Sequence, residues 1–176
     1  MERKMKLQRA ENDDFDLIYD DLEKSFIPEE RRDRVDARRL MEDGEYTVYH
    51  VLDADKRVGF ITVWELDGFA FIEHFVIYEQ FRNCGYGSRA LTLLKEKYDN
   101  IVLEAEPPTE GIPARRVAFY ERCGFCRNEQ YYIQPPYRQG EDGVELVLMS
   151  CPTVLDDFRR TAREIYSKVY KKVYIF

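Results

Sequence analysis

The stretch that decides the fold is Phe75-Val-Ile-Tyr-Glu-Gln-Phe-Arg82-Asn-Cys-Gly85-Tyr-Gly87-Ser88. An apolar segment typical of a strand runs into a short loop, and two glycines then open a helix. The first N–H groups of a helix have no internal partner, and glycine lets a phosphate approach them closely. The spacing Arg82-x-x-Gly85-x-Gly87 therefore predicts an anion site, with an ordinary strand-to-helix turn as the alternative.

A second informative stretch follows further along the chain, at Ala118-Phe-Tyr-Glu-Arg-Cys-Gly-Phe125. It ends a predicted helix, with Gly124 at the position past the helix end that favours a left-handed backbone. The first stretch lacks both the Gly-Lys-Ser/Thr ending of nucleotide triphosphate loops and the three-glycine dinucleotide fingerprint. The two stretches, in this order and with a strand between them, resemble the coenzyme A pyrophosphate loop and the second signature of the GNAT acetyltransferase superfamily. The resemblance covers roughly residues 5 to 150.

The pattern of apolar residues indicates the surrounding elements. It predicts strands at 5–10, 46–52, 57–65, 69–77, 101–106, 130–134 and 144–150. It predicts helices at 12–26, 28–41, 85–98 and 113–123, the second of them highly charged and on the surface. The three nearly continuous apolar strands in the middle suit a sheet covered on both faces. We therefore expect an α/β fold with a mixed central sheet of about six to seven strands flanked by helices and, as the resemblance implies, splayed in the middle.

The C-terminal part of the chain predicts one further helix, from 153 to about 171. Its apolar residues recur at three- and four-residue steps, at Leu155, Phe158, Ala162, Ile165, Val169 and Val173. We expect this stripe to pack on its own domain, with packing on a second copy in a homodimer as the alternative. Residues 1–176 are thus interpreted as a single acyltransferase domain in which 151–176 is a C-terminal helical extension.

Composition narrows the class of protein. The 176 residues carry a formal net charge of −7 and are 44% hydrophobic, which is typical of a soluble globular chain. The acidic balance disfavours nucleic acid as a partner. The first ten residues, Met1 to Ala10, lack the apolar run of a signal peptide, and no stretch is long enough to span a membrane. We expect a cytoplasmic protein without a membrane partner and with reduced cysteines.

The resemblance implies acetyl-CoA as co-substrate. Backbone groups of Phe75, Val76 and Ile77 would pair with the pantetheine arm. Backbone amides would hold the pyrophosphate at Arg82, Asn83, Cys84, Gly85, Tyr86, Gly87 and Ser88. One departure from the family pattern puts a further contact in doubt: the loop 107–114 has no Asn, which many members use to bind the cofactor.

Catalysis requires a proton donor and a proton acceptor. The resemblance implies that Tyr120 protonates the departing thiolate, and the alternative is an aromatic packed on the core. A carboxylate can take the proton of the acceptor amine. Glu73 and Glu104 are the candidates, and alternation along a strand puts Glu106 on the face of Glu104 as a substrate-binding group. Each acid has a salt bridge or a solvated strand end as its alternative. His74 is expected on the opposite strand face from Glu73, as a satisfied core histidine.

The sequence thus predicts an N-acetyltransferase that moves an acetyl or related acyl group to a primary amine of a small molecule or peptide by direct attack. A noncatalytic acyl-CoA-binding or scaffold protein with the same fold is the alternative. A redox protein using Cys123-Gly-Phe-Cys126 is less favoured, because this pair spans a helix end and follows no strand. No second Cys/His pair completes a zinc site, so we expect no metal.

Overall fold

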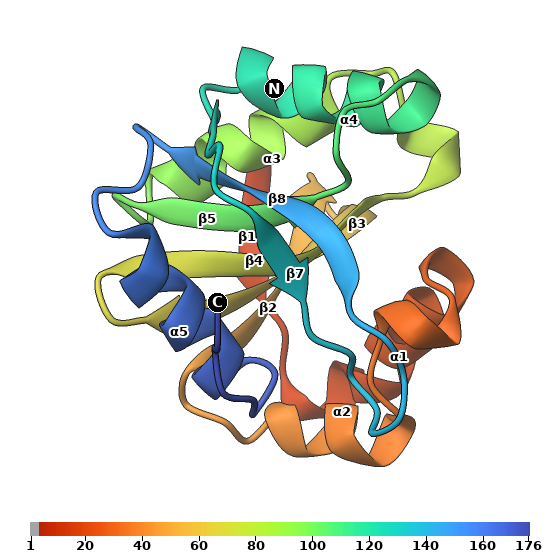
Figure 1. Cartoon of the computed structure of the whole chain (residues 1–176). Helices are drawn as coiled ribbons and strands as arrows, with labels where there is room; N and C mark the ends of the chain where they lie inside the picture. The colour runs from red at the N-terminus through yellow and green to blue at the C-terminus, as the bar shows by residue number, and fades with distance from the viewer. Residues whose placement is uncertain (1–3) are drawn as a thin grey trace.

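An eight-stranded sheet forms the centre of the molecule (Figure 1). The computed structural model describes residues 4–176, so the first three residues of the N-terminal stretch lie outside it. The strands are β1 (Met5–Arg9), β2 (Tyr46–Asp53), β3 (Lys56–Leu66), β4 (Phe69–Ile77), β5 (Ile101–Ala105), β6 (Cys126–Arg127), β7 (Tyr132–Gln134) and β8 (Val144–Cys151). Their order is β1-β2-β3-β4-β5-β8-β6, with β7 paired to β8. The pairing of β4 with β5 is parallel, and the other pairings are antiparallel.

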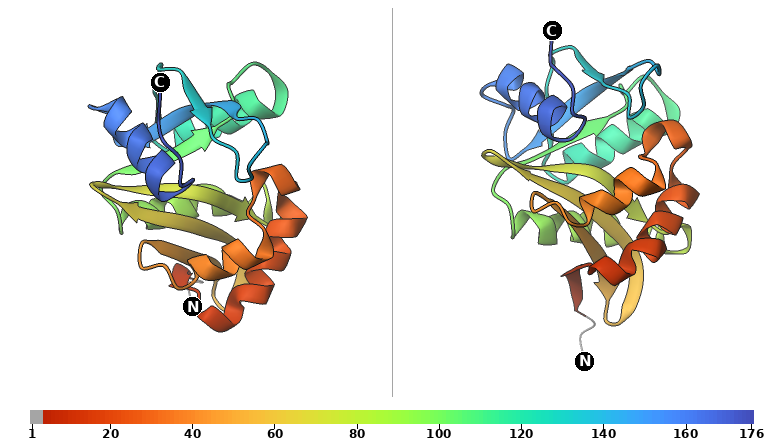
Figure 2. Two further views of the ribbon diagram at one scale, coloured as in Figure 1. Left: turned by 60° about the horizontal axis from the view of Figure 1, so that its bottom comes forward. Right: turned by 90° about the horizontal axis from the view of Figure 1, so that it is seen from below.

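Helices cover both faces of this sheet (Figures 1 and 2). We call the side of α1 (Phe15–Ser25) and α5 (Phe158–Lys168) the α5 face; the short helix α2 (Arg34–Leu40) packs against its edge. We call the side of α3 (Tyr86–Lys95) and α4 (Gly111–Arg122) the α3 face. Each face has its own buried apolar cluster, because each strand sends alternate side chains to opposite sides. The mixed α/β architecture is therefore confirmed, and the two-residue β6 brings the sheet to eight strands.

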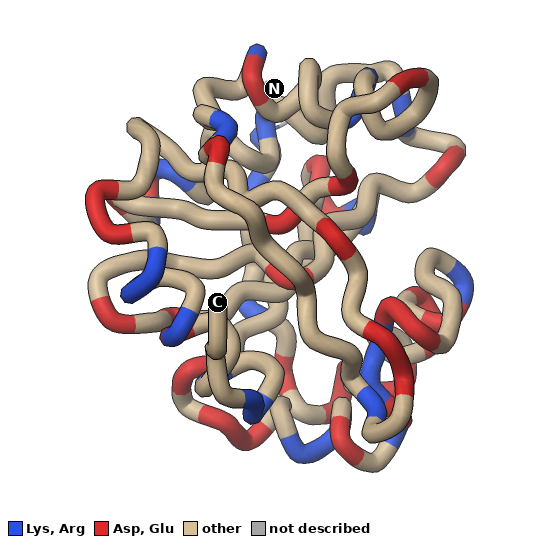
Figure 3. The backbone as a smooth tube through the Cα atoms, in the orientation of Figure 1, with Lys and Arg blue, Asp and Glu red and all other residues tan. Residues whose placement is uncertain are grey.

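The predicted continuous helix over 28–41 is wrong. A 3₁₀ turn covers Pro28–Glu30, and α2 begins only at Arg34, because Arg31 and Asp33 have extended backbone angles. The break lets the intervening Arg32 turn inward, where its guanidinium contacts Glu73 of β4. The rest of α2 does lie on the surface as expected, and basic and acidic segments of α2 and α1 meet there (Figure 3).

The C-terminal helix is shorter than expected but packs on its own chain. α5 spans Phe158–Lys168, and Ala162 and Ile165 are fully buried against the α5 face. The expected stripe does not continue to Val173, whose side chain is 82% exposed beyond the helix end. The start of α4 also differs from the prediction. This helix begins at Gly111 and holds Pro113 in its first turn, where the missing N–H of proline breaks no hydrogen bond.

A β-bulge in the middle of the sheet changes which side chains share a face. Thr62 pairs with His74 and Val63 pairs with Ile72, so Glu73 has no register partner on β3. A bulge of this kind re-aims the following side chain. As a result Glu73 and His74 both contact Tyr137 on the α5 face, and the expected placement of His74 on the opposite face is wrong. His74 is buried as expected, with its Nε2 2.9 Å from the Glu30 carbonyl oxygen.

The strands β4 and β5 separate after a short parallel pairing. Ala70 to Ile72 pair with Ile101 to Leu103, and the two strands then diverge. Register partners share a face of the sheet, as Phe71 and Val102 do in the cluster of the α5 face. Glu73 lies two residues after Phe71, and Glu104 lies two residues after Val102. Both carboxylates are therefore on the α5 face, where the two strands diverge.

Gly59 of β3 fixes the distance between β3 and β4 beside this opening. A Cβ atom added there would lie 2.1 Å from the backbone oxygen of Val76. We expect Gly59→Ala to lower the free energy of unfolding by about 1–3 kcal/mol, because the neighbouring strand must shift to relieve the overlap. Urea denaturation measures this. Gly44→Ala is the matched control, since no atom lies within 4 Å of its added Cβ. Equal stability of the two variants would contradict this account of the strand spacing.

Candidate active site

A cavity of about 930 Å³ opens between α3, α4 and the diverging end of β4. Its lining includes most of the predicted cofactor residues, namely Phe75, Ile77, Arg82, Asn83, Gly85, Tyr86, Gly87 and Ser88, together with Tyr120. The side chain of Val76 is instead buried in the cluster of the α5 face. Cys84 is exposed within the same loop. The structure thus brings the two sequence motifs together around one cavity.

The loop before α3 turns sharply through two left-handed residues. Asn83 has a φ of 61° and Gly85 a φ of 77°, and α3 begins at the next residue, Tyr86. The first N–H groups of this helix are therefore at the rim of the cavity, where the helix dipole favours negative charge. Arg82 is held by a 3.1 Å hydrogen bond from its Nε to the Ile77 carbonyl oxygen, which leaves its terminal nitrogens available.

Further positive charge comes from α4, whose Arg115, Arg116 and Arg122 also line the cavity. Guanidinium groups and a helix N-terminus together form a binding environment for phosphate groups. The residues present therefore fit a ligand that carries several phosphates at this end and a less polar arm along Phe75 and Ile77.

The backbone of β4 offers hydrogen-bonding groups toward the opening. The N–H groups of His74 and Tyr78 donate toward β3, to Thr62 Oγ1 and to the Val58 carbonyl oxygen, each at 2.9 Å. N–H directions alternate along a strand, so those of Phe75 and Ile77 point to the other edge. At that edge β5 has already diverged, and an extended ligand arm lying there would pair with β4 as an added strand does.

Tyr120 lies near the C-terminal end of α4, where its ring packs against Phe119 and Phe125 with centroids 5.3 and 5.8 Å away. Burial raises the pKa of Tyr120 to about 12, although the charge of Arg116 acts in the opposite direction. The phenol is therefore neutral at pH 7 and its O–H can act as a proton donor. Lys95 of α3 donates to the carbonyl oxygen of Cys123 and so fixes the end of α4.

Glu73 is a buried and fully partnered carboxylate on the α5 face. Its side chain is 1% exposed and forms an ion pair with Arg32. It also accepts hydrogen bonds from Trp64 Nε1 and the Tyr137 hydroxyl, each at 3.0 Å. Burial works to raise the pKa of Glu73, but the charge of Arg32, the neighbouring His74 and the hydrogen bonds from Trp64 and Arg32 outweigh it and lower the pKa below its usual value. Glu73 is therefore ionised and neutralised by the chain itself.

Glu104 lies on the same face but has a different environment. It accepts hydrogen bonds from the hydroxyls of Tyr132 (2.5 Å) and Tyr170 (2.7 Å) and from Gln134 Nε2 (2.8 Å). Among the described residues, no Lys, Arg or His forms an ion pair with it. Burial raises the pKa of Glu104 to about 7, against the effect of the three hydrogen bonds. A carboxylate that titrates near neutral pH can act as a general base.

The third predicted acid, Glu106, does not join this pair. β5 ends at Ala105, so strand alternation does not carry on to Glu106. Its half-exposed carboxylate lies 3.5 Å from Arg116 of α4, which lines the 930 Å³ cavity. The structure adds Arg32, Tyr132 and Tyr170, which sequence patterns did not indicate, and Gln134 and Tyr137 of the loop 134–143 join them. Their aromatic and polar character was visible in the sequence, but only the fold shows that they meet at two carboxylates.

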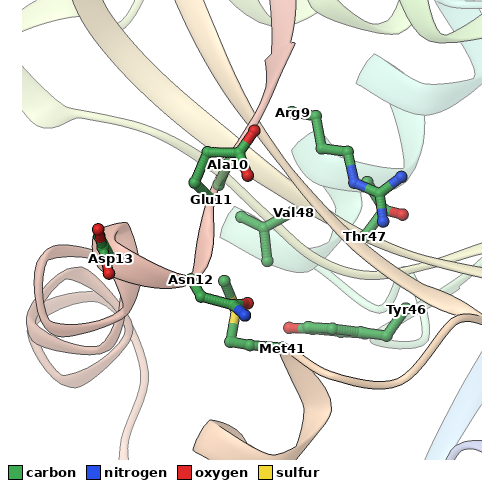
Figure 4. Close-up of a pocket in the computed structure, with 9 residues that line it drawn as sticks. All are labelled: Arg9, Ala10, Glu11, Asn12, Asp13, Met41, Tyr46, Thr47 and Val48. Atoms are coloured by element: carbon green, nitrogen blue, oxygen red, sulfur yellow. The ribbon is translucent and has the colours of Figure 1, made fainter.

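A second hollow, of about 410 Å³, lies between the end of β1, the start of the α1 segment, the end of α2 and β2 (Figure 4). Figure 4 shows its nine lining residues, which include none of the predicted catalytic or cofactor-binding side chains. Within residues 4–176, no group of three or more His, Cys, Asp or Glu side chains is arranged to hold a metal ion. Most of the predicted cofactor residues and Tyr120 line the 930 Å³ cavity instead, so the candidate site is this cavity together with the adjoining opening between β4 and β5.

Comparison with known proteins identifies the family. The sequence model of the Acetyltransferase (GNAT) family matches residues 15–125. The chain belongs to the GNAT acetyltransferase family. A solved GNAT-family structure from Bacteroides thetaiotaomicron is 35% identical, with a TM-score of 0.86, and the match covers 94% of this chain and 98% of that one. The expected acyltransferase class is thereby confirmed.

More distant solved structures share the fold. Arabidopsis thaliana NAA60 in complex with acetyl-CoA is 11% identical, with a TM-score of 0.64 over 84% of this chain and 97% of that chain. The spermidine/spermine N-acetyltransferase SpeG from Vibrio cholerae, in mutant form, is 16% identical, with a TM-score of 0.61 over 83% and 92%. No curated protein matches this GNAT chain. In the part of the chain that the structure describes, no helix has the length and apolar character needed to cross a membrane.

The environment of Glu104 predicts a specific dependence of stability on pH. Its pKa rises from 4.5 to about 7 on folding, so between these values the folded protein holds a proton that the unfolded chain releases. This contribution to stability is complete below about pH 4.5 and is lost as the pH rises through about 7. We expect Glu104→Gln to gain stability relative to wild type over this range, by about 1–3 kcal/mol.

Chemical denaturation at a series of pH values measures this difference. Glu145→Gln, on the exposed part of β8, is the control and should follow the wild-type curve. A constant difference between Glu104→Gln and wild type from pH 4 to pH 8 would show that Glu104 does not titrate in this way.

Proposed function

We propose that the protein is an N-acetyltransferase that transfers an acetyl group, or a related acyl group, from acetyl-CoA to a primary amine of a small molecule or peptide. The observation that carries this proposal is the opening between β4 and β5. A phosphate-suited cavity with Tyr120 lies on one side of the opening, and the partnered carboxylates Glu73 and Glu104 lie on the other. A cytoplasmic location and action without nucleic acid belong to the same proposal, as does a homodimer as one possible assembly.

Acetyl-CoA would be held by the loop from Arg82 to Ser88 and by the β4 backbone at Phe75 and Ile77. The cofactor supplies the acetyl group as an activated thioester. The N–H of Phe75, directed into the opening, is placed to stabilise negative charge on the acyl oxygen. Holding both reactants in one opening replaces a collision of two free molecules, which is itself a large part of the rate enhancement.

Proton transfer is divided between two residues. Glu104 would accept a proton from the acceptor ammonium on one of its carboxylate oxygens, because its pKa of about 7 suits a base at neutral pH. The freed amine nitrogen would attack the thioester carbonyl carbon, so that a C–N bond forms and the C–S bond breaks. Tyr120 would donate its hydroxyl proton to the departing sulfur and regain a proton from the acylated nitrogen. The two groups come from opposite faces of the sheet, so the acceptor and the cofactor approach the opening from different sides.

The sequence predicts both Glu73 and Glu104 as candidate bases, and the geometry favours Glu104. The oxygens of Glu73 already accept three hydrogen bonds, and its pKa is lowered by Arg32. Glu73 would therefore contribute to catalysis through its negative charge near the acceptor, and not by accepting a proton. Glu106, paired with Arg116 at the cofactor cavity, is better placed to orient that arginine than to bind the acceptor.

Binding of acetyl-CoA to the α3 loop is tested by thermal unfolding. A ligand present at about 100 times its Kd adds about 2.7 kcal/mol to the free energy of unfolding, so the melting temperature should rise. Gly85→Glu should abolish the rise, because it places a carboxylate in the phosphate site. Gly68→Glu is the control, since Gly68 also has a positive φ but lies in the turn between β3 and β4. Loss of the rise in both variants, or no rise in the wild type, would argue against the cofactor site.

The acid and base roles are tested by steady-state kinetics with a panel of amines. We expect Tyr120→Phe and Glu104→Gln each to lower kcat by about 10²–10⁴-fold while the acetyl-CoA melting shift persists. In the wild type, kcat/KM should rise with pH through about 7, as Glu104 loses its proton. A scaffold protein would show no turnover to lose, and a redox protein would lose its activity in Cys123→Ser instead.

A further inference from the structure

The two carboxylates at the opening differ in whether a cation of the chain neutralises them. Arg32 forms an ion pair with Glu73, whereas no cation in the described chain pairs with Glu104. Arg32 is itself nearly buried, with 12% of its side chain exposed, and its pKa is raised because the attraction of Glu73 outweighs the effect of burial. The acceptor side of the opening therefore presents one uncompensated carboxylate.

The surroundings of the Arg32 guanidinium form a cation-binding cage. Its Cζ lies 4.9 Å from the ring centroid of Tyr137 and 5.6 Å from that of Trp64. Aromatic rings facing a cation beside a carboxylate are the arrangement that binds organic ammonium groups. The guanidinium is anchored in this cage by a 2.6 Å hydrogen bond from its Nη2 to the Val169 carbonyl oxygen at the end of α5. The chain's own cation thus occupies a place suited to a substrate cation.

The cage and the Glu104 site adjoin each other. Tyr137 bonds to Glu73, Tyr170 bonds to Glu104, and the two tyrosine rings lie 5.3 Å apart. An amine that reaches Glu104 therefore has the cage as its neighbour. A second ammonium group on the same molecule would then meet the Arg32–Glu73 pair, where the charge of Arg32 cancels the attraction that Glu73 would otherwise exert on it.

We propose that Arg32 is a specificity-determining residue that restricts the acceptor to amines with a single cationic group near the reacting nitrogen, and so excludes short diamines and polyamines. This inference rests on the proposed acetyl transfer and on Glu104 as the group that meets the amine. In this arrangement Glu73 and Arg32 neutralise each other, so the pair adds no net charge to the acceptor side.

The test compares butylamine with 1,4-diaminobutane, two probes of equal carbon length that differ in one ammonium group. The ratio of their kcat/KM values with acetyl-CoA, and of their affinities by calorimetry with coenzyme A present, is measured for wild type and variants. Wild type should favour butylamine. Arg32→Gln frees the charge of Glu73 and should shift the ratio toward the diamine by at least about tenfold.

Three further variants fix the sign of the effect. Arg32→Gln combined with Glu73→Gln removes both charges and should restore the wild-type ratio. Glu73→Gln alone leaves Arg32 unpaired and should weaken both amines, the diamine more strongly. Lys171→Gln is the matched control, because the exposed Lys171 also lies near the Trp64 ring, at 5.7 Å, but does not pair with Glu73; it should change the ratio by less than about twofold.

Melting curves with and without acetyl-CoA accompany every variant and separate the possible failures. An Arg32→Gln protein that melts cooperatively and keeps its acetyl-CoA shift, yet shows the wild-type ratio, overturns the role of Arg32 and leaves the proposed function standing. Absence of binding of both amines to wild type and to Arg32→Gln also overturns it. Loss of the acetyl-CoA shift in wild type instead removes the proposed function on which the inference rests.

Discussion

The limited parallel pairing between β4 and β5 is the constraint on which the rest of the site depends. Backbone N–H and C=O groups in a protein interior need partners, and a fully paired sheet would satisfy those of β4 internally. Here the pairing stops at Ile72 and Leu103, so the following groups of β4 face an opening. The fold therefore leaves hydrogen-bonding capacity unused at this opening, where the proposed cofactor arm and acceptor would meet, and the helices on either face add charged and aromatic groups around it.

Charge is distributed differently on the two sides of this opening. On the α3 face, arginines and a helix N-terminus face a cavity that suits phosphates. On the α5 face, charged groups are buried and must be balanced within the protein. An ionised pair such as Arg32 and Glu73 is costly to bury unless its remaining hydrogen bonds are satisfied, and Trp64, Tyr137 and the Val169 carbonyl oxygen satisfy them. Glu104 is buried without such a cation, and burial therefore raises its pKa to about 7.

Much of the fold could be predicted from the sequence because it follows from local patterns. The apolar strands β2 to β4, the Gly85 turn into α3 and the amphipathic stripe of α5 were all indicated by spacing alone. The bulge at Glu73 was not, because a single extra residue leaves no mark on an apolar run, and it reversed the expected face of His74. The inward turn of Arg32 was hidden for a similar reason: in a segment dense with charge, nothing distinguishes one buried arginine from its exposed neighbours. Tertiary contacts alone decide such cases.

The last part of the chain has a consequence for how a protein of this kind can diversify. The family match ends at residue 125, and the cofactor cavity lies almost entirely within it. The proposed acceptor side also depends on residues beyond that limit: Tyr132, Gln134 and Tyr170 hold Glu104, and the carbonyl of Val169 holds Arg32. Under the proposed function, the groups that would meet the acceptor amine are therefore fixed in part by the C-terminal segment of the chain. Substitutions of Tyr132, Gln134 or Tyr170 would alter that side while leaving the residues around the phosphate-suited cavity unchanged.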